Sequence, residues 1–165
     1  MKYVLTVLCA LLFSSGYCDM MGDVEYQLPN IAKDWVVANK DDNTNGTTVI
    51  YQPKNPKRVS KEFFGVNNNR FPSDINDQEA LKKGITAVIP DMQVDLQVLQ
   101  KGDNDVFYEL SGKQNGKEVI HGWAHVFVTK EGTTLLIYET NDLANLPKIG
   151  SAWRQALQTA HIKKA

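Results

Sequence analysis

The sequence lacks most of the features that reveal a protein's function. Only two of its 165 residues are cysteines, Cys9 and Cys18, and both lie near the N-terminus. The rest of the chain therefore has no disulfide, no cysteine nucleophile and no thiolate metal ligand. A Gly-x-Ser-x-Gly turn, a glycine-rich phosphate loop and internal repeats are also missing. The sequence thus identifies no catalytic residue and no cofactor.

An excess of positive charge is missing as well. Lysine and arginine number 18 against 19 aspartate and glutamate residues, for a net charge of −1. Nucleic-acid-binding domains usually have a basic face and a high isoelectric point, so the composition disfavours a nucleic-acid partner. Lys54, Lys57, Arg58 and Lys61 form a basic stretch that would suit an acidic partner. A solvent-exposed loop is the favoured interpretation, because isolated runs of charge usually indicate exposure.

The N-terminus has the three parts of a secretory signal peptide. Lys2 precedes an apolar run over residues 3–13, and small residues follow at 14–16. This run is shorter than the roughly 20 residues that span a bilayer, and no later stretch is long and apolar enough for a transmembrane helix. We expect residues 1–18 to be the signal peptide, with cleavage near 16–18. The protein would then be exported and either periplasmic or secreted.

A lipid anchor at Cys18 is disfavoured. Lipoprotein signals have a small residue just before the acylated cysteine, and Tyr17 occupies that position. Removal of the leader takes away one charged residue, Lys2, which leaves a net charge of −2. The remaining residues, 19–165, are of a length that predicts a single domain with its own core.

Residues 121–140 predict a long β-hairpin. Both arms are rich in β-branched and aromatic residues, and Gly132 would supply the left-handed conformation of a three-residue turn after Lys130 and Glu131. Both faces of the arms are apolar, whereas a strand buried on one face alternates with polar residues. The sequence therefore places this hairpin in the middle of an antiparallel sheet, with helices on opposite faces.

The other segments complete an α+β pattern. Residues 92–99 alternate between two faces, which predicts a half-buried strand, and residues 106–110 are expected to form the next strand. Together with the hairpin they would make a four-strand antiparallel meander. Asp77 would cap a helix that reaches residue 88, and Ser151 would cap a closing helix that reaches residue 160. Earlier strands are expected at 25–28, 47–52 and 61–66, with a turn at 39–46.

This order of elements resembles the PsbP-like superfamily, which is named for an extrinsic subunit of photosystem II and includes small exported bacterial proteins. The resemblance lies in residues 26–29 (YQLP) followed by Trp35, in 48–53 (TVIYQP), and in the segments 81–88, 121–138 and 153–160. It implies an antiparallel sheet with helices on both faces. It implies no catalytic residues.

One short motif suggests a cation site. Asp41, Asn43 and Asn45, followed by Gly46, match the opening of a calcium-binding loop, whose oxygen ligands occupy alternate positions. The twelfth position is Gln52 instead of a bidentate glutamate, and a strand follows instead of a helix. Asn-Gly is also a common hairpin turn, so a plain turn is the favoured alternative.

His121 and His125 share one face of the predicted hairpin, with Trp123 between them. Four residues of strand span about 13 Å, so one zinc ion with bonds of about 2 Å cannot bridge both histidines. The three side chains would line a ligand groove, or Trp123 would pack beneath a helix with the histidines at the edges. The second interpretation is favoured, because both faces of the hairpin are apolar.

These observations favour an exported, non-enzymatic binding or accessory factor that acts on a protein partner in the envelope or outside the cell. One alternative is a secreted hydrolase that uses His121 or His125 with a nearby carboxylate. The other is a cation-binding module built on residues 41–46.

Overall fold

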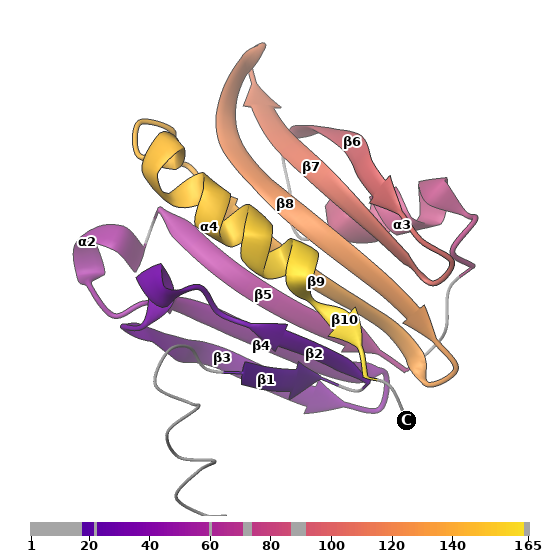
Figure 1. The fold of residues 1–165 in the computed structure, drawn as a ribbon. Coiled ribbons are helices and arrows are strands. Elements are labelled where there is room, and N and C mark those ends of the chain that lie inside the picture. The colour runs from indigo at the N-terminus through magenta and orange to yellow at the C-terminus, as the bar shows by residue number, and fades with distance from the viewer. Residues whose placement is uncertain (1–17, 22, 60, 71–73, 87–91, 164–165) are drawn as a thin grey trace, which may run out of the picture.

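The computed structural model describes residues 18–21, 23–59, 61–70, 74–86 and 92–163. Its main element is an antiparallel sheet of seven strands in the order β3-β4-β5-β9-β8-β7-β6 (Figure 1). The strands are β3 (Trp35–Asn43), β4 (Gly46–Pro53), β5 (Glu62–Asn69), β6 (Gln93–Lys101), β7 (Asp105–Gln114), β8 (Lys117–Thr129) and β9 (Gly132–Thr140). Strand β9 is fourth in this order, so the predicted hairpin β8-β9 is central, as its two apolar faces require.

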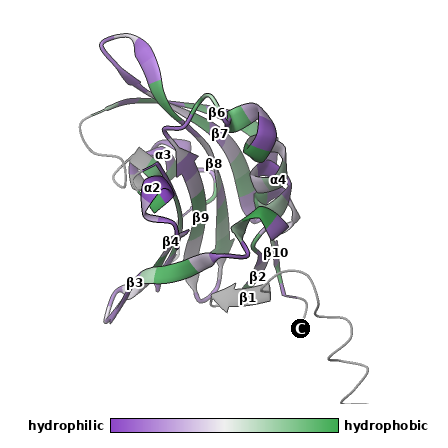
Figure 2. Cartoon of the chain, turned by 90° about the vertical axis from the view of Figure 1, so that its left-hand side faces the viewer, coloured by the Kyte–Doolittle hydropathy of each residue, from purple (hydrophilic) through white to green (hydrophobic). Residues whose placement is uncertain are grey.

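The two main helices cover opposite faces of this sheet, as the sequence predicted (Figure 2). Helix α3 (Gln78–Thr86) buries Leu81 and Ile85 in a cluster with residues such as Tyr108. Helix α4 (Leu146–Thr159) buries Trp153 and Leu157 in a second cluster on the other face. The fold is thus a single domain in which the helices are small and the sheet is large.

Asp77 caps α3 as predicted. The main-chain N–H of Ala80 donates to Oδ1 of Asp77 at 2.9 Å, which satisfies one of the free donors of the first turn. Leu81 and Ile85, one turn apart, both face the sheet. Residues 87 and 88, which the prediction included in this helix, lie outside the described residues.

The predicted start of α4 was wrong. The helix begins at Leu146, five residues before the expected cap at Ser151. Pro147 suits the first turn of a helix, where its missing N–H costs nothing. Gly150 lies inside the helix and allows it to approach the sheet, since a Cβ there would lie 2.9 Å from the ring of Trp123.

The predicted turn at residues 39–46 was also too long. Strand β3 continues through Asn43, and Lys40, Asp41 and Asp42 pair with Val49, Thr48 and Thr47 of β4. Only the four residues from Asn43 to Gly46 form the turn. Strand β3 lies at the edge of the sheet and is exposed from Val36 onward, so its polar composition resembles that of a loop.

The tip of the central hairpin is one residue shorter than predicted, and its glycine meets two requirements. Strand β8 pairs Thr129 with Gly132, so only Lys130 and Glu131 lie between the strands. Gly132 has a φ of 148°, a positive value that favours glycine, as the sequence predicted. A Cβ there would collide with the main-chain oxygen of Asn69 in β5. The close approach of β5 therefore requires glycine.

A smaller sheet lies on the α4 side of the molecule. It contains β1 (Cys18–Met21), β2 (Val24–Gln27) and β10 (His161–Ile162), with β2 in the middle. A 3-10 turn, η1 (Asn30–Ala32), follows β2, and a short helix, α2 (Pro56–Val59), precedes β5. The sequence did not predict β1, β10, η1 or α2. Val24 and Tyr26 of β2 join the cluster beneath α4, which brings the N-terminal segment alongside this helix.

Candidate functional site

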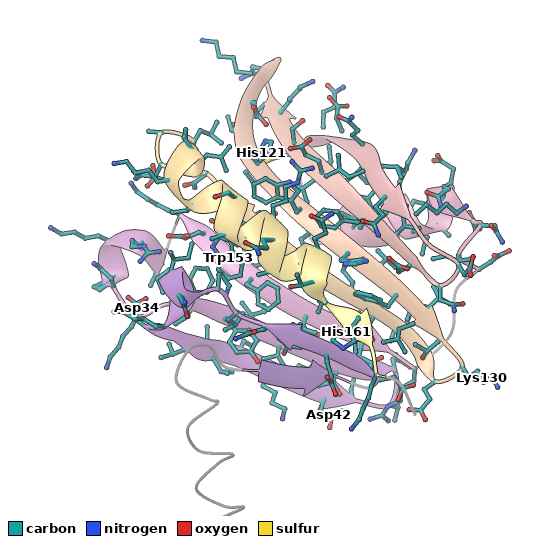
Figure 3. All side chains as sticks on the ribbon, in the orientation of Figure 1. Asp34, Asp42, His121, Lys130, Trp153 and His161 are labelled. Atoms are coloured by element: carbon teal, nitrogen blue, oxygen red, sulfur yellow. The ribbon has the colours of Figure 1, made fainter. Side chains whose placement is uncertain are left out.

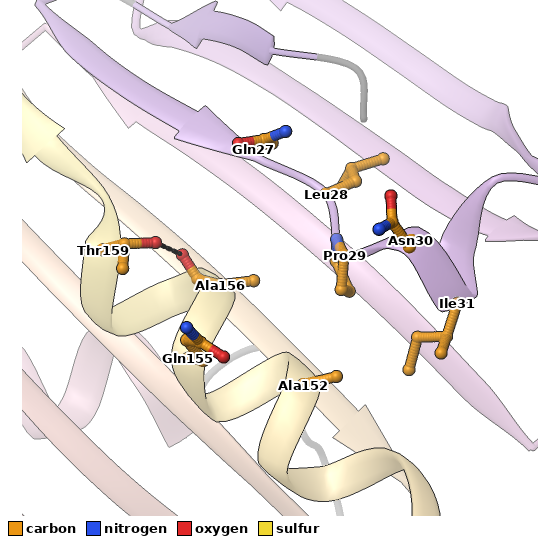
Figure 4. A pocket seen from close by; sticks show the side chains of 9 residues that line it. All are labelled: Gln27, Leu28, Pro29, Asn30, Ile31, Ala152, Gln155, Ala156 and Thr159. Carbon is orange, nitrogen blue, oxygen red and sulfur yellow. Dashed lines mark hydrogen bonds between the residues drawn. The ribbon is translucent and has the colours of Figure 1, made fainter. Parts of the chain in front are cut away.

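A groove of about 530 Å³ runs between α4 and the segment that joins β2 to η1 (Figure 4). We call it the α4 groove. Ala152 and Ala156, one turn apart on α4, have side chains too small to fill the space beside the helix. Pro29 leaves β2 in an extended conformation, and η1 then turns the chain. The groove is lined by Gln27, Leu28, Pro29, Asn30, Ile31, Ala152, Gln155, Ala156 and Thr159.

The lining that the structure describes combines polar and apolar residues, and none of them is charged. Gln27, Asn30 and Gln155 carry amide groups, which both donate and accept hydrogen bonds. The hydroxyl of Thr159 donates to the main-chain oxygen of Ala156 at 3.1 Å and keeps its acceptor capacity. The other lining residues are apolar. The volume lies within the range of about 300–1,000 Å³ that is usual for ligand sites, and the chemistry suits an uncharged ligand with alternating donors and acceptors.

The floor of the groove is an aromatic core. Leu28, only 6 % exposed, lines the groove and also belongs to the core cluster that contains Phe64 and Trp153. Trp153 stacks on Tyr138 with ring centroids 4.2 Å apart and contacts Trp35 at 4.8 Å. The indole nitrogens of Trp35, Trp123 and Trp153 have no hydrogen-bond partner among the described residues. Only the side chain of Leu28 would therefore lie between a ligand in the groove and the core that contains Trp153.

The structure places Trp123 and His125 beneath α4, in the core. Trp123 is 5 % exposed, stacks on Tyr138 and belongs to the α4 cluster. His125 is 3 % exposed, and its Nδ1 and Nε2 atoms each lie 2.8 Å from an oxygen, the carbonyl of Leu157 and Oδ2 of Asp105 respectively. A carbonyl only accepts, so Nδ1 carries a hydrogen. This ring joins β7, β8 and α4.

His121 lies nearer the start of β8 than His125 does, toward the top of the view in Figure 3. Its Nδ1 atom is 2.9 Å from Oε1 of Glu118, and its Nε2 atom is 3.2 Å from Oε1 of Glu109. Its ring meets Trp123 edge-on with centroids 5.1 Å apart. Both histidines thus contact carboxylates, but neither lines the α4 groove.

The residues of the candidate cation loop bond to one another. Asp41 lies within β3, and its Oδ2 atom accepts from Nδ2 of Asn43 at 3.1 Å. The main-chain N–H of Asn45 donates to Oδ1 of Asn43 at 2.9 Å, which is the pattern of an Asx turn. Gly46 completes the turn and begins β4. Within the described part of the chain, no three His, Asp or Glu side chains are arranged to hold a metal ion.

Sequence reasoning missed Glu139, a buried carboxyl group near the end of β9. It is 9 % exposed, and its Oε2 atom has no hydrogen-bond partner among the described residues. Burial raises its pKa to about 7. The signal was present in the sequence, because Glu139 continues the alternation of Leu135 and Ile137, which face the α3 side.

Comparison with known proteins identifies the fold. No protein-family model matches the sequence, and no curated protein matches it. The solution structure of cyanobacterial PsbP from Synechocystis sp. PCC 6803 superimposes with a TM-score of 0.61 at 17 % identity, covering 90 % of this chain and 91 % of the other. The fold is PsbP-like. LpqN of Mycobacterium tuberculosis, described as involved in cell envelope biogenesis, matches with a TM-score of 0.50 at 16 % identity over 91 % of both chains.

The PsbP-like fold confirms the resemblance that the sequence suggested on residues 26–35 and 121–138. At this level of identity the likeness concerns the fold alone. Within the described residues, no helix has the length and apolar character needed to cross a membrane.

Proposed function

We propose that this chain is an exported, non-enzymatic binding or accessory protein that holds a segment of a protein partner in the α4 groove. Cleavage near residues 16–18 would release a single domain of residues 19–165. The PsbP-like fold supports this role, because LpqN, one of the proteins with a similar fold, is described as involved in cell envelope biogenesis. The partner would be met in the periplasm, in the envelope or outside the cell.

The observation that carries the proposal is the chemistry of the groove lining. Side-chain amides at Asn30 and Gln155 match the donors and acceptors of an extended peptide backbone. The apolar residues between them suit small apolar side chains of the same segment. None of the lining residues described is charged, so a charged ligand would lose its hydration without a compensating ion pair. An uncharged extended polypeptide is therefore the favoured occupant.

The hydrolase alternative has less support. It requires a histidine beside a carboxylate in an open cleft, and both histidines do contact carboxylates. However, His125 has both ring nitrogens engaged and is almost fully buried. His121 is held between two glutamates outside the α4 groove.

Selection from a random peptide library against the folded domain tests the proposal. We expect enriched peptides that are extended and uncharged, with small apolar residues at alternate positions. Their binding should change the fluorescence of the protein, because Trp153 lies beneath the groove. Peptides selected for a shared charge, or no enrichment above background, would contradict the proposed ligand class.

A pair of matched variants assigns the binding to the groove. Ala156→Arg fills the groove and adds a charge, so it should weaken peptide binding at least tenfold. Ser151→Arg makes the same addition at an exposed position of α4 that does not line the groove. It should leave binding unchanged. Equal binding to both variants would show that the peptides bind elsewhere.

A further inference from the structure

Glu139 lies beside a second, smaller pocket on the far side of the sheet from α4. The pocket has a volume of about 90 Å³ and is lined by Val59, Lys61, Glu62, Phe63, Ile120, Glu139, Thr140 and Asn141. Strands β5 and β9 place Phe63 directly opposite Glu139. Unlike the α4 groove, this pocket contains a buried carboxyl group.

The two buried glutamates of the described residues differ in how they are satisfied. Glu62 bonds through Oε1 to Nε of Arg58 at 2.8 Å and through Oε2 to the hydroxyl of Tyr138 at 3.1 Å. The Oε2 atom of Glu139 has no hydrogen-bond partner among the described residues. Lys61 lines the pocket, but its Nζ atom lies 3.4 Å from Oδ2 of Asp142. A buried, unpaired carboxylate is costly, so this site gains most from a positively charged donor.

We propose that the Glu139 pocket binds a primary alkylammonium ion. The ammonium group would pair with the carboxylate of Glu139 where that side chain lines the pocket, and its alkyl chain would contact Val59 and Ile120. The ring of Phe63 adds the attraction of an aromatic face for a cation. A water molecule needs roughly 10–15 Å³ of such space, so the pocket has room for a chain of a few heavy atoms. The ammonium could come from a free amine or from the lysine side chain of a partner.

The proposed ligand makes binding depend on pH. Lys61 and Glu62 are the other titratable groups that line the pocket, and both already have partners. Because the pKa of Glu139 is about 7, the group is mostly ionised at pH 8 and mostly protonated at pH 6. The ionised fraction falls about tenfold between these values. Affinity for an ammonium ion should fall by a similar factor.

NMR titration of the domain with ethylammonium at pH 8 tests the proposal. We expect saturable shifts of the amide signals of Phe63 and Glu139, with half-saturation about tenfold higher at pH 6. Nα-acetyl-lysine methylamide serves as the second probe. Binding of both probes supports a lysine side chain as the source, and binding of ethylammonium alone supports a free amine.

Two variants serve as controls, and the same spectra report whether each is folded. Glu139→Gln keeps the size of the side chain but removes the charge, so saturable binding should be lost. Glu118→Gln changes an exposed glutamate outside the pocket and should bind as the wild type does. The proposal is overturned if the wild type shows no saturable shift at pH 8, or if Glu139→Gln binds equally well. The test does not involve the α4 groove, so its outcome is independent of the proposed peptide site.

Discussion

The Nδ1 atom of His125 lies 2.8 Å from the main-chain oxygen of Leu157, so a central strand holds the last turn of α4 by a buried hydrogen bond. The other ring nitrogen faces Asp105 of β7 at the same distance. One side chain therefore joins three elements on the side of the sheet that carries the α4 groove. The position of α4, and with it one wall of the groove, depends on this contact.

Replacement of His125 by phenylalanine should destabilise the fold. The ring would still fill the space between Phe107 and Phe127, but the carbonyl of Leu157 would stay buried without its donor. An unsatisfied buried polar group costs about 1–3 kcal/mol, and the loss of the Asp105 contact adds to it. We expect a decrease of about 2–4 kcal/mol in the free energy of unfolding, measured with urea. His161→Phe, at an exposed site, should change it by less than about 0.5 kcal/mol.

Glu139 should make stability depend on pH. Its pKa is about 7 in the folded protein against 4.5 for an ordinary glutamate, so the folded state binds the proton more tightly. Its contribution is fully present below pH 4.5 and is lost as the pH rises to 7. The size of this loss is about 3 kcal/mol.

The Glu139→Gln variant tests this dependence. It should be more stable than the wild type at pH 8 and should gain little or nothing at pH 4.5. Unfolding curves across this range measure the difference directly. If the difference in free energy of unfolding between the two proteins stays constant with pH, burial does not raise the pKa of Glu139.

Gly150→Ala should fail to stabilise α4. In an open helix this change gains about 1 kcal/mol. Here the new Cβ would lie 2.9 Å from the buried ring of Trp123, and overpacking of a core costs about 1–3 kcal/mol. We expect a net loss of stability, larger in Gly150→Val, in thermal or urea unfolding. Clear stabilisation by Gly150→Ala would mean that α4 and β8 are less closely packed than described.

Calcium should leave the melting temperature unchanged if residues 41–46 form a plain turn. The side chains of Asp41 and Asn43 already bond within the turn, and a ligand that binds only the folded state raises its stability. Thermal unfolding with and without millimolar CaCl₂ provides the measurement. A rise in melting temperature that disappears in Asp41→Ala would instead support the cation-binding alternative.

Much of the sheet was predictable from local patterns. The central position of β8-β9 follows from apolar residues on both faces, such as Trp123 and Ala124. The cap at Asp77 follows from residue type and spacing. The length of β3 was missed because an edge strand satisfies its exposed side with polar residues, which leaves no alternation to detect. The start of α4 was missed because Ser151 is itself a residue type that caps helices, although it lies inside this one.

The α4 groove was not predictable in this way. It exists because residues 27–31 lie beside residues 152–159, and no local pattern reports a contact between segments so far apart. The Glu139 site was predictable only in part. The inward position of Glu139 follows from the alternation of β9, but the pocket beside it depends on how β5 and β8 pack there. Local periodicity therefore predicted the central strands and the presence of the two main helices, while the candidate sites arise from the packing of all the elements.

Photo-crosslinking in the native cells tests the central claim most directly. A crosslinking amino acid at position 152 faces the α4 groove, and one at the neighbouring position 151 is exposed away from it. We expect the exported chain, found outside the cytoplasm, to form a discrete adduct with one polypeptide through position 152 but not through 151. The crosslinked segment should be uncharged. An intracellular chain, or the same adducts from both positions, would contradict this claim.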